Sequence, residues 1–399
     1  MQELAGKSTS RIEIIDVLRG FTLLGIALVH FPEQYYAGQP PDTHKDMTTH
    51  GVIDTVVSLI VGIFITGKFF MIFSFLFGMS FYIQLSKSDG SVAFFFRFAW
   101  RLIVLFLIGV MHHLHYRGDI LTIYAVLGVG LLISYRLPDK VLLIIALALV
   151  FNVPSLILRT IDIFSGTTDS FLNADQSVLE KYFNTFKSGT YAEIIRANWH
   201  EFQGKIDFQF QSGRVYITLG LFLLGLYAGR KNVFSNPVAF KKYIITCLWI
   251  LLGAVIVTVS IFGGLATSGV QITPPIGFAV GGAGYDVFNA CLSCIYVGLV
   301  VTFFQKEKWK SRLMNFYAVG RMGLTTYLMQ AVAGVLIFSG MGLGLLGEIG
   351  AALSALIGIA YFVLQMIFSN YWFTKFQFGP VEWLWRSLTY FKIQPLKKS

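Results

Sequence analysis

The sequence predicts an all-α integral membrane protein, a bundle of about ten transmembrane helices. Of its 399 residues, 55% are hydrophobic and only 13% are charged, whereas soluble domains carry about 25% charged residues. The mean hydropathy is +0.67. Long apolar runs recur from one end of the chain to the other, which is typical of a chain that crosses a membrane repeatedly.

Ten apolar segments have the length and composition of transmembrane helices. They are 17–34, 68–85, 99–116, 119–136, 140–159, 214–229, 243–264, 279–304, 322–340 and 349–369. The stretch 52–66 is shorter and contains Asp54 near its start. We therefore expect it to form an interfacial or re-entrant helix.

The distribution of basic residues predicts that both termini lie in the cytoplasm. With the N-terminus inside, 21 of the 31 lysines and arginines fall in inner segments, as the positive-inside rule requires. This bias also accounts for the net charge of +10, so nucleic acid is not an expected partner. If 52–66 crossed the membrane on its own, every later loop would be inverted.

Three regions follow from this plan. Residues 1–159 form an N-terminal transmembrane bundle, 160–213 an extracytoplasmic cap, and 214–399 a C-terminal transmembrane bundle. The cap segment carries two short helical patterns, 177–186 and 191–202. It serves either as a simple cover over the bundle or as a lid that binds an acceptor.

Arg19 and His30 are two costly polar residues in the first apolar segment. Eleven steps of about 100° bring them to one helical face, roughly 16 Å apart along the axis. One interpretation is an Asp16–Arg19 ion pair with an interfacial histidine. The other is that Arg19 holds an anionic group, such as a phosphate, at the inner face while His30 acts as a base at the outer side.

A second polar cluster contains His112, His113 and His115 and lies at the outer hairpin after the third span. His112 and His115 share a helical face and could chelate, but the sequence supplies no third ligand, so no metal is expected. A polar wall of an outer cavity, shared with His30, is the favoured interpretation. Asp119 follows a glycine and is expected to cap the next helix.

Other polar residues leave two alternatives open. Asp286 and Asn289 in the eighth span either face the cavity or close an interhelical hydrogen bond. The basic inner-side residues, among them Arg97, Arg101 and Arg321, either mark the cytoplasmic side or help to bind an anionic cofactor. The sequence has no Walker A motif, dinucleotide-type glycine fingerprint or nucleophile elbow, so ATP hydrolysis and NAD chemistry are not supported.

Five motifs carry a resemblance to a known family. They are IDVLRGF at 15–21, FFMIFSFLFG at 69–78, GDILTIY at 118–124, GRMGLTTYLMQ at 320–330 and FGPVEWLWR at 378–386. In this order they resemble the YeiB family of bacterial membrane proteins of unknown function. The resemblance covers nearly the whole chain and implies a location in the bacterial cytoplasmic membrane.

The Arg-x10-His spacing is also similar, more distantly, to the transmembrane acyltransferase superfamily, which includes the acyltransferase-3 proteins and heparan glucosaminide acetyltransferase. This resemblance implies transfer of an acyl group, such as acetyl, from cytosolic acyl-CoA to a sugar or glycolipid acceptor on the far side of the membrane. The implied base is His30, assisted by His112 and His115. From their positions we expect Arg19, Arg97, Arg101 and Arg321 to bind the donor, and His113, Asp119, Asp286 and Asn289 to line the cavity.

Two other function classes compete with the acyltransferase hypothesis. A small-solute transporter would favour inverted repeats with paired broken helices at mid-membrane, and the sequence shows only Pro154 near such a position. A non-enzymatic scaffold or sensor would leave the His30 cavity closed. The sequence leaves the acceptor, the acyl chain length and the oligomeric state open, a homodimer included.

Overall fold

The computed structural model describes residues 13–88, 91–165, 175–268 and 273–398, which fold into helices without a named β-strand. The predicted all-α class is confirmed. The first half contains α1 (Glu13–His30), α2 (Val52–Phe64), α3 (Phe69–Ser86), α4 (Val92–His115), α5 (Leu121–Ser134), α6 (Asp139–Val150), α7 (Val153–Ser165), α8 (Gln176–Ser188) and α9 (Tyr191–His200). The second contains α10 (Phe202–Gln211), α11 (Arg214–Arg230), α12 (Ala239–Thr267), α13 (Pro274–Phe304), α14 (Glu307–Leu313), α15 (Asn315–Arg321), α16 (Gly323–Phe338), α17 (Ala351–Lys375) and α18 (Pro380–Tyr390).

The protein is a multi-pass membrane protein by the length and apolar character of its helices. Within the described residues, five helical segments are long and apolar enough to cross a membrane, or up to eight if three bent helix pairs each count as one span. The bent pairs are α6–α7, α10–α11 and α15–α16. The count of about ten spans stays a prediction.

The segment 52–66 forms a helix that continues toward the next one. Helix α2 is followed after a short break by α3, and Val52–Ser86 together form one candidate span of 35 residues. The segment thus leads directly into α3, and an interfacial position for it stays a prediction. Most of its large apolar side chains are exposed, which suits contact with lipid. It still adds no crossing of its own, so the predicted order of loops is unchanged.

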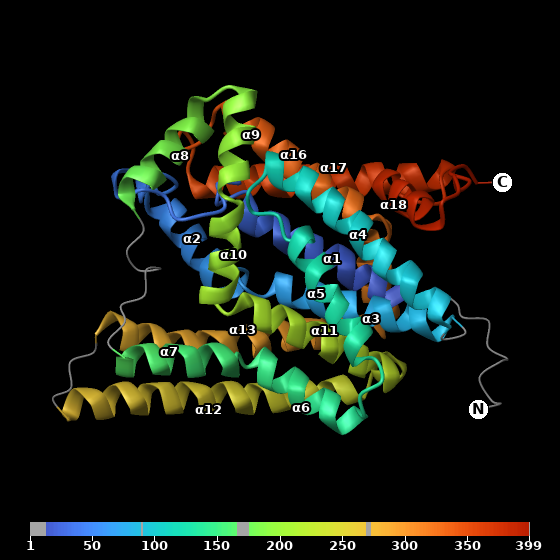
Figure 1. Cartoon of the computed structure of the whole chain (residues 1–399), viewed down its shortest axis with the longest axis horizontal. Helices are drawn as coiled ribbons and strands as arrows, with labels where there is room; N and C mark the ends of the chain where they lie inside the picture. The colour runs from blue at the N-terminus through green and yellow to red at the C-terminus, as the bar shows by residue number, and fades with distance from the viewer. Residues whose placement is uncertain (1–12, 89–90, 166–174, 269–272, 399) are drawn as a thin grey trace.

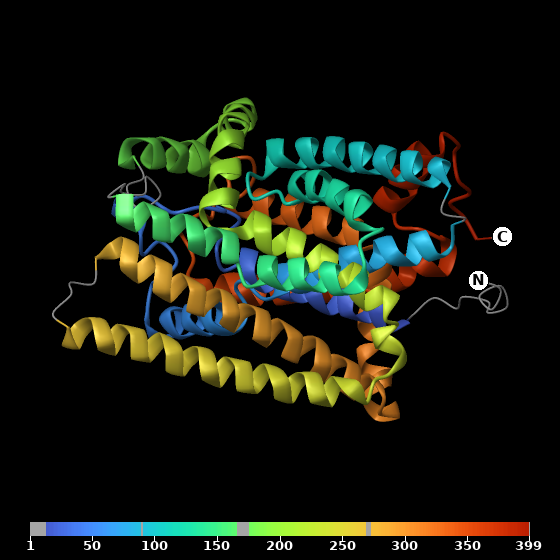
Figure 2. The ribbon, with the colours of Figure 1, turned by 60° about the horizontal axis from the view of Figure 1, so that its bottom comes forward.

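Most helices run along the long axis of the molecule, and the described chain ends lie together (Figure 1). The start of α1 and helix α18 occupy one end, which we call the inner end, and α8 and α9 occupy the opposite, outer end in both views (Figures 1 and 2). Helix α1 therefore runs from the inner end to the outer end. This matches the predicted arrangement, in which both termini share one side of the membrane.

Small residues allow two close helix crossings that build the core. A Cβ on Gly78 of α3 would collide with the backbone oxygen of Phe222 in α11, and one on Gly320 of α15 would collide with the oxygen of Asp16 in α1. These glycines lie in the motifs at 69–78 and 320–330, so close packing explains their place there. Because α11 packs on α3 and α15 on α1, helices from both sides of the cap share one core.

Helices α8, α9 and α10 form the outer-end cap, and the predicted helical patterns at 177–186 and 191–202 are confirmed. Residues 166–174 of the predicted cap, like the polar N-terminal residues 1–12, lie outside the described residues. Thr190 and Glu193 make a reciprocal capping box that starts α9. Helix α10 then turns by 71° into α11, so the cap connects directly to the membrane bundle.

Candidate functional site

A cavity of about 720 Å³ lies beneath the cap. Its lining comes from the outer end of α1, the α2–α3 junction, the α4–α5 loop, α10 and the start of α11. Of the residues predicted to form the site, His30 and Asp119 line it. We call it the outer-end cavity. Because α10 forms one wall, the cap does more than cover the bundle.

His30 ends α1 and points its ring at a buried tyrosine. Its Nδ1 atom lies 3.0 Å from the Tyr116 hydroxyl and 3.7 Å from a Glu33 oxygen. Tyr116 is almost fully buried, whereas the His30 side chain is 23% exposed. No described residue forms a hydrogen bond with His30 Nε2. If Nδ1 donates its proton to Tyr116, the Nε2 lone pair is free to accept a proton.

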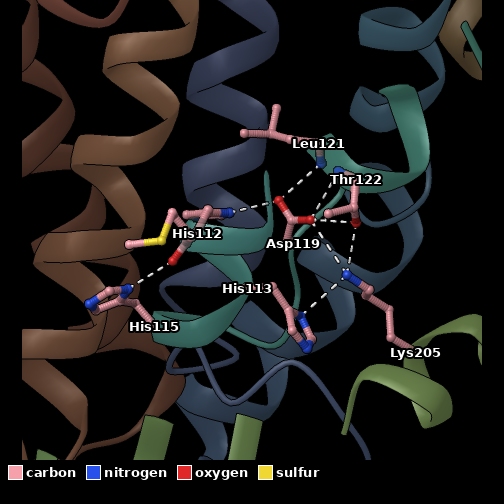
Figure 3. Close-up of polar contacts among 8 residues, drawn as sticks. His112, His113, His115, Asp119, Leu121, Thr122 and Lys205 are labelled. Carbon is pink, nitrogen blue, oxygen red and sulfur yellow. Dashed lines mark hydrogen bonds and ion pairs between the residues drawn. The ribbon is translucent and has the colours of Figure 1, made fainter. Parts of the chain in front are cut away.

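Asp119 is the centre of a polar network in the α4–α5 loop (Figure 3). One carboxylate oxygen accepts hydrogen bonds from the Leu121 amide and His112 Nδ1, and the other from the Thr122 amide and hydroxyl. Lys205 Nζ from α10 lies 3.5 Å from the carboxylate. The two amide bonds confirm that Asp119 caps α5.

The charge state of Asp119 follows from these contacts. Burial raises the pKa of its carboxyl, but the hydrogen bond and charge of His112 and the charge of Lys205 together bring the pKa down to about 2. Asp119 is therefore ionised at neutral pH. Its negative charge offsets Lys205 and fixes the orientation of the His112 ring.

His113 and His115 tie α4 to the cap. His113 Nε2 lies 2.8 Å from the Asn198 carbonyl and its Nδ1 lies 3.3 Å from Lys205 Nζ. His115 Nε2 lies 2.8 Å from the Tyr191 hydroxyl. His112 and His115 therefore serve separate partners on two sides of α4. Among the described residues, no group of three or more potential ligands is placed to hold a metal ion.

Arg19 is engaged by protein groups inside the bundle. Its guanidinium lies 2.6 Å from the Asp16 carboxylate and donates to Ser80 and to the Gly320 carbonyl. These contacts join α1, α3 and α15. The structure thus contains the Asp16–Arg19 ion pair that was one interpretation of the sequence. Donor binding by Arg19 stays a prediction.

The other predicted donor-binding arginines contact aromatic rings of the C-terminal region. The Arg97 guanidinium lies 5.3 Å from the Tyr390 ring centre, Arg101 lies 3.7 Å from Trp385, and Arg321 lies 4.0 Å from Phe373. The rings of Trp385 and Tyr390 belong to α18. None of these arginines, nor Arg19, lines the outer-end cavity.

Asp286 and Asn289 lie in α13 and outside the lining of the cavity. Asp286 accepts a hydrogen bond of 2.8 Å from Asn152, at the break between α6 and α7. This is the interhelical bond that the sequence left as an alternative. The Oδ1 atom of Asn289 is buried without a hydrogen-bond partner, and its amide group lies beside Gly67, a cavity residue.

Sequence reasoning missed most of the cavity residues, four of which matter for the chemistry. Tyr116, Arg117, Lys205 and Arg214 all line the cavity. Tyr116 and Arg117 follow the histidine cluster directly, so their position was a usable signal. Lys205 and Arg214 lie far along the chain, and only the tertiary fold brings them to the cavity.

Comparisons with known proteins decide the family. Residues 228–392 match a family described as "Protein of unknown function (DUF418)". The chain is 31% identical to the uncharacterized protein YxaH of Bacillus subtilis (strain 168) over 411 residues, which cover 98% of this chain and 97% of that protein. It belongs to the YeiB-like family. To the uncharacterized protein YeiB of Escherichia coli (strain K12) it is 25% identical over 399 residues, 94% of this chain and 95% of that one. No solved structure matches this member of the family.

Proposed function

We propose that this YeiB-like protein is an integral membrane acyltransferase that moves an acyl group, such as acetyl, from cytosolic acyl-CoA to an acceptor in the outer-end cavity. The observation that carries the proposal is the position of His30. Its ring lines a cavity large enough for a small ligand, and Tyr116 and Glu33 lie near Nδ1. An imidazole held at one nitrogen and open at the other suits general-base catalysis.

The chemical step uses this histidine as a proton carrier. The Nδ1–H group donates a hydrogen bond to the Tyr116 hydroxyl. The free Nε2 atom takes a proton from the hydroxyl or amine of the acceptor. The acceptor atom then bonds to the thioester carbonyl carbon, and the carbon–sulfur bond breaks. The CoA thiolate takes the proton from His30, which returns to its neutral form. Atoms and charges balance without a further reactant.

The donor arrives from the inner end in this proposal. The polyanionic head of acyl-CoA is attracted by the basic inner segments, including Arg19, Arg97, Arg101 and Arg321. Its thin pantetheine arm covers roughly the 16 Å that separates Arg19 from His30 on α1. This direction requires both termini to face the cytoplasm of a bacterial cell, with the cap on the outside. The acceptor is then a sugar or glycolipid, which reaches the cavity from the outer side.

The test is a transfer assay on purified protein in detergent with radiolabelled acetyl-CoA. Label transfer to added sugars or extracted lipids, or thioester hydrolysis, reports turnover. We expect His30→Ala to lower turnover by a factor of about 10² to 10⁴ while the protein stays folded. His200→Ala, at an exposed position on α9, is the matched control. Unchanged turnover in His30→Ala removes the histidine from the mechanism, and absence of acetyl-CoA binding removes the enzyme proposal.

A small-solute transporter is the second candidate, favoured by the broken helices. The bends of 47° between α6 and α7 and of 71° between α10 and α11 meet at a polar contact. There Asn152 donates to both Asp286 and the Ser212 carbonyl. Discontinuous helices with polar groups at the break are typical of transporters. Solute flux in proteoliposomes that is unaffected by His30→Ala would favour this candidate.

A further inference from the structure

Arg214 differs from the other cations of the outer-end cavity. Three lysines or arginines line the cavity. Arg117 pairs with Glu201 at 3.2 Å, and Lys205 lies 3.5 Å from Asp119. The Arg214 side chain has no salt bridge or hydrogen bond to any residue in the described part of the chain. Among the described residues, it is the cavity cation that no carboxylate contacts directly.

Two carboxylates, Glu33 and Asp286, attract the Arg214 charge from beyond salt-bridge distance. Glu33 lies 3.7 Å from His30, Asp286 accepts from Asn152, and Asp207 accepts from Gln203. None of them comes within salt-bridge distance of Arg214. An arginine at the start of a membrane helix is costly unless a counter-charge or water solvates it. A ligand in the cavity is a natural source of that counter-charge.

Two aromatic rings lie beside the Arg214 guanidinium without using its donors. The group lies 5.1 Å from the Phe70 ring centre and 5.0 Å from that of Phe208. Cation–π contacts of this kind leave the guanidinium N–H groups free for hydrogen bonds. Arg214 is also the first residue of α11, so the positive end of that helix dipole lies beside it. Both features favour an oxyanion, which a guanidinium binds with two parallel hydrogen bonds.

One part of the cavity wall is apolar, while Glu33, Glu201 and Asp207 also line the cavity. Its apolar wall includes the side chains of Ile26, Val29, Phe69 and Phe73. A ligand that fills the cavity therefore needs an apolar part as well as an anionic one. We propose that the outer-end cavity binds an amphiphile whose oxyanion, a phosphate or carboxylate, pairs with Arg214. Only one part of this inference rests on the proposed function: if the protein transfers acyl groups, the amphiphile is the acceptor.

The test measures binding without an acyl donor, so its failure is distinct from failure of acyl transfer. Purified protein in micelles of a neutral detergent is titrated with dodecyl phosphate, dodecanol and inorganic phosphate, and the shift in thermal unfolding temperature is recorded. We expect dodecyl phosphate to stabilise the wild type and dodecanol to have little effect. Arg214→Gln should weaken the apparent affinity about tenfold or more, the loss of roughly one charge-assisted contact.

Two further variants keep the result interpretable. Arg196→Gln removes an exposed cap arginine and should bind dodecyl phosphate as the wild type does. Arg214→Lys keeps the charge without the planar fork and should bind with intermediate affinity, which also covers the case in which Arg214→Gln fails to fold. An equal shift with inorganic phosphate would overturn the amphiphile, because it would show that the apolar part adds nothing, and would leave an oxyanion site for a soluble ester. Equal binding of dodecyl phosphate by the wild type and both Arg214 variants, or equal effects of dodecanol and dodecyl phosphate, would overturn the proposal.

Discussion

The two ends of the bundle use their cations in different ways. At the inner end, Arg19 contacts a carboxylate, a hydroxyl and a carbonyl, and Arg101 stacks on Trp385. At the outer end, Lys205 and Arg117 pair with carboxylates around a cavity, and Arg214 has no such partner. The inner arginines therefore hold helices together, whereas the outer cations surround a space that a ligand can enter.

This difference matters for the acyltransferase proposal. Its donor half depends on inner arginines that already have protein partners. Its acceptor half depends on an open cavity with a histidine, a buried tyrosine and an unpaired arginine. The outer half is therefore the better supported of the two, and experiments that separate structural from ligand-binding cations will decide how far the contrast holds.

The largest expected effect comes from the Asp119 network at the outer end. Asp119→Ala removes the counter-charge of Lys205, the partner of His112 and the cap of α5 together. Because a buried charge without its partner is strongly destabilising, we expect a loss of about 3–5 kcal/mol of unfolding free energy. Unfolding of the purified protein in detergent, followed by circular dichroism, measures it.

A matched carboxylate tests whether burial is the cause. Asp207 lines the same cavity but is exposed and accepts from Gln203. Asp207→Ala should change stability by no more than about 0.5 kcal/mol. Equal effects of the two variants would show that the Asp119 network is not a structural frame for the cavity.

The sequence predicted some parts of this outer site and could not predict others. A glycine and an aspartate before an apolar run predicted the Asp119 cap, because capping is local. The contact between Asp119 and Lys205 joins residues far apart in the chain, so no local pattern contains it. Arg214 looks in sequence like any arginine at a span end, such as Arg230. Only the structure shows that Arg230 pairs with Asp139 and that Arg214 lacks a partner.

The fold could be predicted because its signals are local in the sequence, whereas the site depends on contacts between distant residues. Apolar periodicity fixes which segments are helical and suits a membrane, whatever their neighbours. It did not show that 52–66 continues into α3, since the break at Ile65–Lys68 interrupts the pattern without bending the path by a large angle. Nor did it show that α18 would pack on α4. At that contact Arg97 and Arg101 lie against the aromatic rings of α18.

The second expected effect concerns the ion pair at the inner end. Arg19→Gln leaves the nearly buried Asp16 without its arginine, and we expect a loss of about 3 kcal/mol. The double variant Asp16→Asn/Arg19→Gln removes both charges and should recover most of that stability. The KM for acetyl-CoA in both variants then tests donor binding. If Arg19 also binds the donor, its loss should raise KM about tenfold. A double variant with wild-type KM would make Arg19 purely structural.

The smallest expected effect concerns the aromatic contacts of α18. Arg101→Met removes a close cation–π contact with Trp385 while keeping most of the side-chain volume, and we expect a loss of about 1–2 kcal/mol. Arg97 lies farther from its ring and is exposed, so Arg97→Met should cost about 0.5 kcal/mol or less. Trp385 also donates a hydrogen bond to the Arg101 carbonyl, which neither variant removes. If both variants are as stable as the wild type but bind acetyl-CoA more weakly, these arginines serve a ligand, and the contrast between the two ends of the bundle fails at the inner end.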